Sequence, residues 1–397
     1  MTATLTEREH EHFLPTYKRL ALEVDHAEGM YVQTLNGDRY LDFLGGIAVN
    51  ALGHSHPGVI AAIERQLRRY MHLSNYFYQD AQITFVEKLC QLSGYDRAFL
   101  SNSGTEAADG AIKFARAWGG SQGKTRVIGF TGGFHGRTYG ALSIMDKPRY
   151  KDGMGPFLPD CITLPFNDIE ALRGAIAEAD GTVCSVFIEH LQGEGGIEWA
   201  TEEFVRELFA LRQQHGFLVI ADEVQAGAGR TGTFFGFDRF NVRPDVVTVA
   251  KAIGGGLPLG AILTTESLAN IWGPGQHGTT FGGNAVACAA GLVVLEELEN
   301  GLMESVRTTG EYLRQQLERL KEEFPAIIRD VRGAGAMMGI GLHVPAEPFV
   351  QALLQRKIIA NATSETVIRL LPPYIFQPEH VDQVVEGLRT VFQEHHP

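Results

Sequence analysis

The sequence predicts an α/β fold: a large domain with a mostly parallel sheet between helices, joined to a smaller α+β domain. Between residues 98 and 249, short runs that are apolar throughout alternate with stretches of helical periodicity. Strands without polar positions are typical of parallel sheets covered on both faces, and their alternation with helices is typical of α/β proteins. After residue 285 the order changes to long helices followed by short mixed elements, which indicates a second domain.

The composition argues against several classes of protein. The 397 residues include 34 Lys+Arg and 47 Asp+Glu, a net charge of −13, whereas a nucleic-acid or anionic-membrane partner favours a basic face. The four cysteines form no CxxC pair, so we expect no metal and no disulfide. No apolar run reaches the ~18 residues that span a bilayer, and no signal peptide is visible, so we expect a cytoplasmic protein.

The first 50 residues predict an arm followed by a hairpin. Residues 1–30 are polar and mixed, whereas residues 29–43 contain two β-rich runs on either side of Asn36-Gly37. An Asn-Gly pair between alternating apolar residues is a strong signal for a tight turn between antiparallel strands. We expect residues 1–50 to join the small domain.

Residues 51–290 predict the large domain. Its apolar runs, which we expect to be strands, cover residues 98–100, 126–130, 183–188, 217–221 and 245–249. Its helical stretches include residues 58–70, 106–118, 169–177 and 202–215. Because helices separate consecutive strands, most of the strands are expected to run parallel.

Residues 291–397 predict the small α+β domain. Residues 285–323 have the pattern of two long helices that are broken near Asn300-Gly301. Strand-like segments follow near residues 327–331, 338–342 and 367–371, with a helix near 348–356 and a last helix from Pro378.

Three short motifs resemble known phosphate, dinucleotide and metal sites but do not match them fully. WGGSQGKT at 118–125 lacks the first glycine of a phosphate loop and follows a helix rather than a strand. GAGRTG at 227–232 matches GxGxxG, but no helix follows and no acidic residue lies ~20 positions on. The pair of histidines at 54–56 has no third metal ligand at a plausible spacing.

An acid and a lysine end two neighbouring apolar runs. FLVIADE ends in Asp222 and Glu223, and the next run, DVVTVAK, ends in Lys251. Ligands of parallel sheets bind at the carboxyl ends of the strands, so Asp222 and Lys251 are expected to face one crevice. Burial lowers the pKa of a lysine and makes its amine a nucleophile toward carbonyl groups, and a buried carboxylate needs a cationic partner.

A phosphate site is predicted at the start of a helix. Ser103 and Glu106 in FLSNSGTE form a capping box, and the same turn leaves backbone N–H groups and two hydroxyl groups at the helix N-terminus. A phosphate site, a lysine and an acid at one edge of a sheet fit one cofactor, pyridoxal phosphate.

Seven blocks in order carry a resemblance to a known family. They are LDFLGGIAVNALGHSHP, FLSNSGTEAADGAIKFAR, GGFHGRTYGALS, IEHLQGEGGI, ADEVQAGAGRTG, VAKAIGGGLPLGA and HGTTFGGN. Over residues 40–373 the chain resembles the fold-type I, class III aminotransferases, which depend on pyridoxal phosphate. Within this family it is most similar to the acetylornithine aminotransferase group.

The resemblance implies a role for each residue around the cofactor. Lys251 matches the catalytic lysine that bonds the cofactor aldehyde, and Asp222 matches the acid that keeps the ring nitrogen protonated. Gln225 matches a residue near the ring hydroxyl, and Val224 packs under the ring. The other cofactor contacts implied are Ser103, Gly104, Thr105, Phe134 and His135.

The resemblance also implies substrate contacts and a partner. Arg137 matches the residue that binds the carboxylate far from the reacting carbon, and Arg369 matches the residue for the α-carboxylate of glutamate or 2-oxoglutarate. Glu194 matches an acidic gate that pairs with Arg369 when the other substrate is bound, and Glu189 belongs to the same block. Thr280 matches a residue that reaches the phosphate of the neighbouring subunit, which implies a homodimer with shared sites.

The implied activity is a ping-pong transfer of the terminal amine of an ω-amino acid to 2-oxoglutarate, giving a semialdehyde and glutamate. N-acetylornithine is the favoured donor, as in arginine biosynthesis. Ornithine, 4-aminobutyrate and other N-acyl diamino acids stay open as donors. Racemases and decarboxylases share the frame, and a non-catalytic binding module on the same fold is the remaining alternative.

Overall fold

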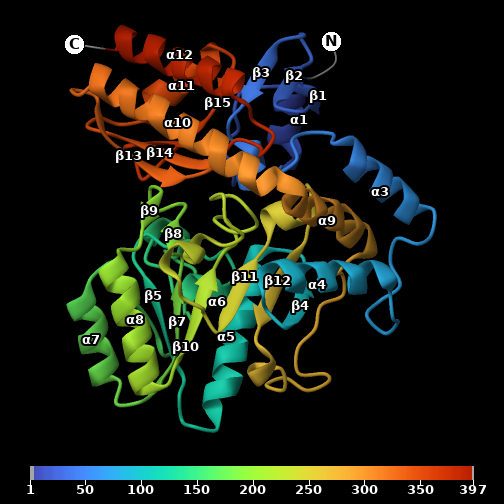
Figure 1. Cartoon of the computed structure of the whole chain (residues 1–397), viewed down its shortest axis with the longest axis vertical. Coiled ribbons are helices and arrows are strands. Elements are labelled where there is room, and N and C mark those ends of the chain that lie inside the picture. Colours follow the sequence, from blue (N-terminus) through green and yellow to red (C-terminus); the bar gives the residue numbers. More distant parts are fainter. Residues whose placement is uncertain (1–3, 396–397) are drawn as a thin grey trace.

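The computed structural model of the chain describes residues 4–395 and is built around a seven-stranded sheet (Figure 1). The ends of the predicted N-terminal and C-terminal regions, residues 1–3 and 396–397, lie outside the described residues. The sheet order is β4-β12-β11-β10-β7-β5-β6. Its strands are β4 (Arg97–Ser101), β5 (Arg126–Phe130), β6 (Cys161–Leu164), β7 (Val183–Ile188), β10 (Leu218–Asp222), β11 (Val246–Val249) and β12 (Gly260–Thr264).

The sheet is mostly parallel, as predicted. The strands from β11 to β6 all pair in parallel, and only β12 runs antiparallel to its neighbours β11 and β4. The sequence predicted the five apolar strands but not β6 or β12, which lie beside glycine- and proline-containing loops.

Helices cover both faces of the sheet. On one face α5 (Gly104–Gly120) packs Ile112 and Phe114 into a core that includes Phe187. On the other face α7 (Ile169–Glu178) and α8 (Glu202–His215) place Leu172 and Phe204 against that side of the strands. Burial on both faces explains why β7 and β10 are apolar almost throughout.

Three further helices pack beside the antiparallel end of the sheet. They are α3 (Pro57–Leu67), α4 (Asp80–Ser93) and α9 (Ala285–Glu297). Phe85 of α4 and Leu295 of α9 belong to the same buried core as Ile253, which follows β11. This core fixes the loop that carries Lys251.

The C-terminal part of the chain forms a four-stranded antiparallel sheet against helices, in the upper half of Figure 1. The sheet order is β13-β14-β17-β16, with β13 (Ile328–Ala334), β14 (Met337–Leu342), β16 (Asn361–Thr363) and β17 (Val367–Leu370). The helices are α10 (Met303–Glu323), α11 (Glu347–Gln355) and α12 (Pro378–Glu394). A π-helical turn (Leu298–Leu302) separates α9 from α10, and Gly301 at φ 109° breaks the helix there.

The N-terminal segment is more structured than the predicted arm. It contains α1 (Leu5–His12) and β1 (Val24–Glu28), and the hairpin is formed by β2 (Tyr31–Thr34) and β3 (Arg39–Asp42). Strand β3 also pairs in parallel with β15 (Ile358–Ile359), where Leu41 lies opposite Ile358. The division of the chain at residues 50 and 290 stays a prediction.

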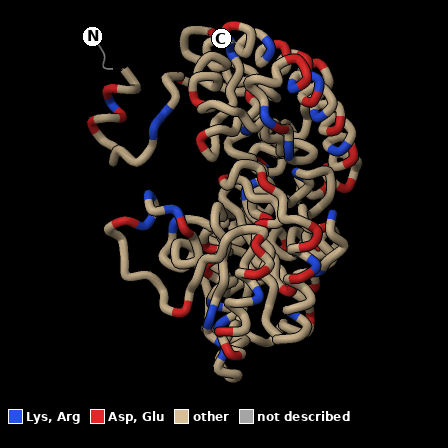
Figure 2. The backbone as a smooth tube through the Cα atoms, turned by 90° about the vertical axis from the view of Figure 1, so that its left-hand side faces the viewer, with Lys and Arg blue, Asp and Glu red and all other residues tan. Residues whose placement is uncertain are grey.

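Charged residues of both signs are interspersed along the chain in the view of Figure 2, which also shows the N-terminal segment standing away from the body of the molecule. Among residues 4–395, no helix is long and apolar enough to cross a membrane.

Candidate active site

A cavity of about 390 Å³ lies where β10 and β11 end and α5 begins. Ligands of such sheets bind at the carboxyl ends of the strands, so this is the position that the topology favours. Eleven of the predicted site residues line the cavity: Ser103, Gly104, Thr105, Phe134, His135, Arg137, Glu189, Asp222, Val224, Gln225 and Lys251.

Asp222 ends β10 and is almost completely buried. Its Oδ2 lies 2.7 Å from His135 Nδ1, and its Oδ1 accepts the backbone N–H of Val224 at 3.0 Å. Burial favours the neutral imidazole, but the hydrogen bond and the charge of Asp222 outweigh it and raise the pKa of His135. His135 is therefore the cationic partner that a buried acid requires.

Lys251 follows β11 at the start of a short 3-10 turn (Lys251–Gly254). Its φ of 50° is a left-handed conformation that residues other than glycine rarely adopt, and such strain is typical of functional positions. Loss of hydration lowers the pKa of Lys251 to about 8, although the carboxylate of Glu194 opposes the shift. About a tenth of this amine is therefore neutral at pH 7, roughly 300-fold more than for an exposed lysine.

The helix N-terminus offers N–H groups rather than the free hydroxyl groups that the sequence suggested. The Ser103 hydroxyl donates to Glu106 Oε2 at 2.8 Å, and Thr105 Oγ1 accepts the backbone N–H of Arg137 at 3.1 Å. Within residues 4–395 the N–H groups of Gly104 and Thr105 have no acceptor, as expected for the first turn of a helix. These donors and the helix dipole form an anion site.

Close packing shapes the wall of the cavity around this anion site. A Cβ at Gly104 would lie 2.7 Å from Cγ1 of Val224, and one at Gly136 would lie 2.1 Å from Thr105 Oγ1. Only glycine lets these segments approach so closely. An anion site, an amine and a buried acid thus surround one cavity that Val224 and Phe134 also line, an arrangement that fits a planar, phosphorylated ring.

Two other acids lie near Asp222. Glu223 does not line the cavity; its carboxylate accepts the N–H groups of Gly236 and Phe237, and burial raises its pKa to about 8. Glu189 accepts the N–H of Phe134 at 2.8 Å, and burial, together with the charge of Asp222, raises its pKa to about 7. Glu189 thus lies against the Phe134 loop, and its substrate role stays a prediction.

Arg369 and Glu194 form the predicted ion pair. Arg369, on β17, is almost fully buried, and its Nη1 lies 2.5 Å from Glu194 Oε1 and 3.2 Å from Gln225 Oε1. Burial opposes ionisation of Glu194, but the charge of Arg369 outweighs burial and lowers the pKa of this carboxyl. Gln225 connects the pair to the wall of the cavity.

Arg137 lies at the rim of the cavity and is held by an aromatic residue that the sequence did not single out. Its guanidinium lies 3.6 Å from the ring centroid of Tyr150 and 5.4 Å from that of Phe134. Tyr150 ends a short 3-10 helix (Pro148–Tyr150) inside the segment KPRYK. The charge pattern of this segment is typical of an ordinary solvent-exposed loop. An aromatic residue within a basic run was the available signal.

Thr280, like Arg369 and Glu194, does not line the cavity. The hydroxyl oxygen of the neighbouring Thr279 accepts a hydrogen bond from Asn102 Nδ2 at 3.1 Å. Asn102 adjoins the phosphate turn. The loop of Thr280 is therefore attached to this chain's own site, although Thr280 itself does not reach into it.

A mostly parallel sheet with an acid and a lysine at neighbouring strand ends, beside a helix N-terminus, defines a pyridoxal-phosphate-dependent transferase of fold type I. The chain belongs to the class-III aminotransferases, whose family model matches residues 14–392. Pyridoxal phosphate is therefore its cofactor, and amino acids and keto acids are its substrates.

The similarity to known relatives covers almost the whole chain. The acetylornithine aminotransferase of Methanocaldococcus jannaschii is 42% identical over 395 residues, which cover 97% of each chain. The solved ornithine aminotransferase of Toxoplasma gondii has a TM-score of 0.93 at 28% identity, covering 98% of this chain and 94% of that one. The solved acetylornithine aminotransferase of Elizabethkingia anophelis has a TM-score of 0.88 at 32% identity, covering 98% of both.

Proposed function

We propose that this chain transfers the terminal amino group of N-acetylornithine to 2-oxoglutarate, giving N-acetylglutamate semialdehyde and glutamate. The observation that carries the proposal is the buried Arg369–Glu194 pair, which Gln225 links to the cavity of Lys251. Curated relatives at 38–42% identity, named acetylornithine aminotransferases, support the choice of donor.

Lys251 and the residues around it have separate roles in proton transfer and in cofactor binding. When bound, pyridoxal phosphate supplies a ring that holds the electron pair left on the substrate carbon after deprotonation. The neutral amine of Lys251 takes the proton from that carbon as general base. Asp222, supported by His135, keeps a proton on the ring nitrogen, while the N–H groups of Gly104 and Thr105 hold the phosphate.

The two arginines let one site accept two substrates. Arg137 binds the carboxylate that is far from the reacting carbon in both substrates. Glu194 neutralises Arg369 while the ω-amine donor is bound, because that donor has no carboxylate next to its reacting carbon. The α-carboxylate of 2-oxoglutarate displaces Glu194 and pairs with Arg369.

The active form that we propose is a homodimer in which Thr280 of each subunit reaches the partner's phosphate site. Exposed apolar side chains lie close to the Thr280 loop: Met71, Tyr76, Phe77, Tyr78 and Phe281, which we call the aromatic surface. The His72 and Phe281 rings lie 5.3 Å apart and connect the two segments. Exposed apolar patches of this kind mark protein interfaces.

A panel of amino donors tests the proposed activity. Purified enzyme is incubated with 2-oxoglutarate and N-acetylornithine, ornithine or 4-aminobutyrate, and glutamate is measured. We expect N-acetylornithine to have the highest kcat/KM and Lys251→Ala to abolish turnover. A higher value for ornithine or 4-aminobutyrate would assign that donor instead. Absence of amino transfer from all three would favour a racemase, a decarboxylase or a binding module.

A further inference from the structure

Three strands of the C-terminal sheet place Arg332, Gly339 and Arg369 in one row. Arg332 on β13 pairs with Gly339 on β14, and Gly339 pairs with Arg369 on β17. Directly paired residues of antiparallel strands lie on the same face of a sheet. Neighbouring strands are about 4.8 Å apart, so the Cα atoms of the two arginines are roughly 10 Å apart with a side-chain-free position between them.

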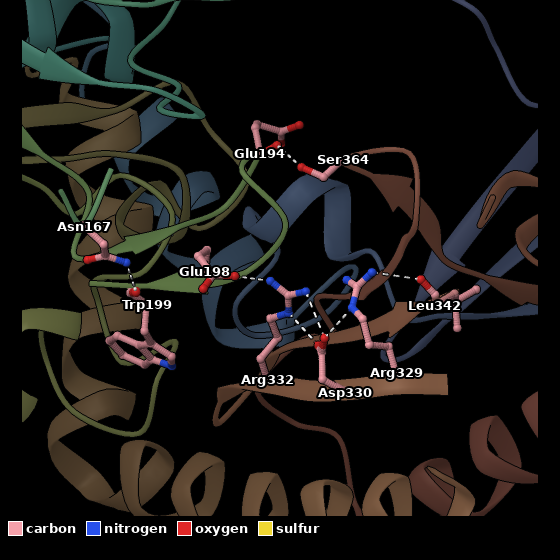
Figure 3. A network of polar contacts seen from close by, with 9 residues as sticks. All are labelled: Asn167, Glu194, Glu198, Trp199, Arg329, Asp330, Arg332, Leu342 and Ser364. Carbon is pink, nitrogen blue, oxygen red and sulfur yellow. Dashed lines mark hydrogen bonds and ion pairs between the residues drawn. The ribbon is translucent and has the colours of Figure 1, made fainter. Parts of the chain in front are cut away.

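A small hairpin lies across this row. It consists of β8 (Leu191–Gln192) and β9 (Glu198–Trp199), with Glu194 in the turn between them. Glu194 pairs with Arg369, and Glu198 pairs with Arg332. Figure 3 shows the Glu198–Arg332 pair and Asp330, whose carboxylate lies 2.8 Å from Arg332 Nε and orients the guanidinium.

The side chain of Ile197 occupies the space above Gly339, between the two ion pairs. This side chain is fully buried, and a Cβ at Gly339 would lie 2.9 Å from Ile197 Cβ. A Cβ at Gly333 would lie 3.0 Å from Ile197 Cγ2. Ile197 has a φ of 56°, which a β-branched residue adopts only when its surroundings impose it. The hairpin is thus docked by an acid, an apolar side chain and a second acid, each opposite its own member of the row.

The main chain at Glu194 is fixed, whereas its carboxylate has a single strong partner. The Glu194 carbonyl oxygen accepts hydrogen bonds from Thr363 Oγ1 at 3.0 Å and from Lys147 Nζ at 3.0 Å. It also accepts one from Ser364 Oγ at 3.4 Å, which Figure 3 shows. When the α-carboxylate of a substrate takes Arg369, the carboxylate of Glu194 can therefore leave without movement of the turn.

We propose that Ile197 and Glu198, through Gly339 and Arg332, are positioning residues that hold the Glu194 carboxylate against Arg369 and thereby set the preference between the two substrate classes. The inference rests on the gate in the proposed function. An α-carboxylate binds Arg369 only in molecules whose Glu194 has moved away, so its apparent affinity falls as the closed form becomes more populated. Loosening the hairpin raises the open fraction, which favours α-carboxylates over ω-amine donors.

Variants of the outer ion pair test this inference with little risk to folding. The Glu198 side chain is 44% exposed, and pairs of this kind contribute little to global stability. We expect Arg332→Met and Glu198→Gln each to lower the ratio of kcat/KM for N-acetylornithine to kcat/KM for glutamate by roughly three- to tenfold. The double variant is expected to match either single one because both remove the same contact. Arg332→Lys, which keeps the charge, is expected to restore most of the ratio.

A binding measurement complements the kinetics. Glutarate has the carboxylate spacing of 2-oxoglutarate but no reacting carbonyl, and its dissociation constant with the holoenzyme is measured by calorimetry. We expect Arg332→Met, Glu198→Gln and Ile197→Ala to bind glutarate more tightly than the wild type. Gly339→Ala, whose methyl group would push Ile197 away, is expected to do the same.

The matched control is Arg329→Met. Arg329 lies on the same strand and bonds Asp330 and the Leu342 carbonyl, but it does not touch the hairpin (Figure 3). The inference is overturned when Arg332→Met, Glu198→Gln and Ile197→Ala keep the wild-type ratio and glutarate constant, or when Arg329→Met shifts both equally. A wild-type enzyme that uses no ω-amine donor overturns the proposed function instead, and glutarate binding then still tests the gate.

Discussion

Lys251 illustrates how the fold changes the chemistry of one residue. An exposed lysine has a pKa near 10.5 and is almost fully protonated at neutral pH, whereas loss of hydration at the end of β11 lowers the pKa of Lys251 to about 8. The same turn imposes a left-handed backbone on this lysine. Strain and lost hydration both cost stability; the turn places the amine at the cavity, and the lost hydration raises its neutral fraction.

The pKa of Lys251 leads to a prediction about cofactor attachment. Only the neutral amine attacks an aldehyde, and the neutral fraction grows as the pH rises through the pKa. We expect the rate at which cofactor-free enzyme recombines with pyridoxal phosphate to rise between pH 6 and about 8 and then to level off. Stopped-flow absorbance measures this rate, with free acetyl-lysine amide as the reference. A rate that keeps rising beyond pH 10, as the reference does, would contradict the assignment.

A second prediction concerns the Tyr150 ring, which lies against the guanidinium of Arg137. We expect Tyr150→Leu to raise KM for N-acetylornithine and for 2-oxoglutarate by roughly fivefold, because a cation–π contact that orients Arg137 is lost. Tyr150→Phe keeps the ring and is the matched control.

A donor without a distal carboxylate separates positioning of Arg137 from general damage. Turnover of 1-aminobutane does not use Arg137, so we expect Tyr150→Leu to leave its kcat/KM unchanged. An equal loss with 1-aminobutane would show that Tyr150 supports the fold rather than the substrate contact.

At the level of elements, the sequence predicted those segments whose pattern is local. The strands β7 and β10 are apolar almost throughout, and α8 has helical periodicity, so their types follow from the sequence itself. β12 is a five-residue strand directly after a glycine- and proline-containing loop, and its strand pairing with β4 and β11 depends on residues far away in the chain. Such tertiary pairing leaves little local signal.

The site shows the same division between local and tertiary information. The motifs located eleven residues that line the cavity, but the contacts that support the site come from other parts of the chain. Tyr150 reaches Arg137 from a neighbouring loop, and Glu198 reaches Arg332 across 134 positions. The row of Arg332, Gly339 and Arg369 depends on the register of three strands, which no spacing in the sequence encodes.

Two glycines in helical regions are expected to respond to alanine in opposite directions. Gly301 separates α9 from α10 at φ 109°, and Gly174 lies inside α7 with helical backbone; a Cβ at either meets no atom within 4 Å. We expect Gly301→Ala to destabilise the protein by about 1 kcal/mol through backbone strain and Gly174→Ala to stabilise it by about 0.5–1 kcal/mol. Thermal unfolding monitored by circular dichroism measures both. A destabilising Gly174→Ala or a neutral Gly301→Ala would contradict this account of the helix break.

For the whole molecule, the proposed homodimer requires that two copies complete one another's sites. Tyr76 and Tyr78 are 94% and 100% exposed in the single chain, a state that a water-soluble monomer avoids. Asn75 donates to the Thr279 carbonyl oxygen at 3.3 Å, so this surface and the Thr280 loop are joined. A partner that covers the aromatic surface would therefore receive Thr280 as well.

Mixed dimers test this sharing because they combine an inactive variant with one that binds the cofactor weakly. Lys251→Ala removes the nucleophile, and Thr280→Ala is expected to weaken cofactor binding by about tenfold through loss of a hydrogen bond to the phosphate. When the two variants form a heterodimer with shared sites, one site carries both substitutions and the other carries neither. Tagged subunits, purified as the heterodimer and assayed at low cofactor concentration, should then show about half of the wild-type activity, from one intact site of a two-fold symmetric pair. If Thr280 instead served its own subunit, each site would carry one substitution and the heterodimer would be no more active than the Thr280→Ala homodimer.

Disruption of the aromatic surface is the complementary test. We expect the double variant Tyr76→Arg, Tyr78→Arg to sediment as a monomer and to bind the cofactor more weakly. The control is Val344→Arg, at an exposed apolar residue outside the aromatic surface, which should leave the dimer intact.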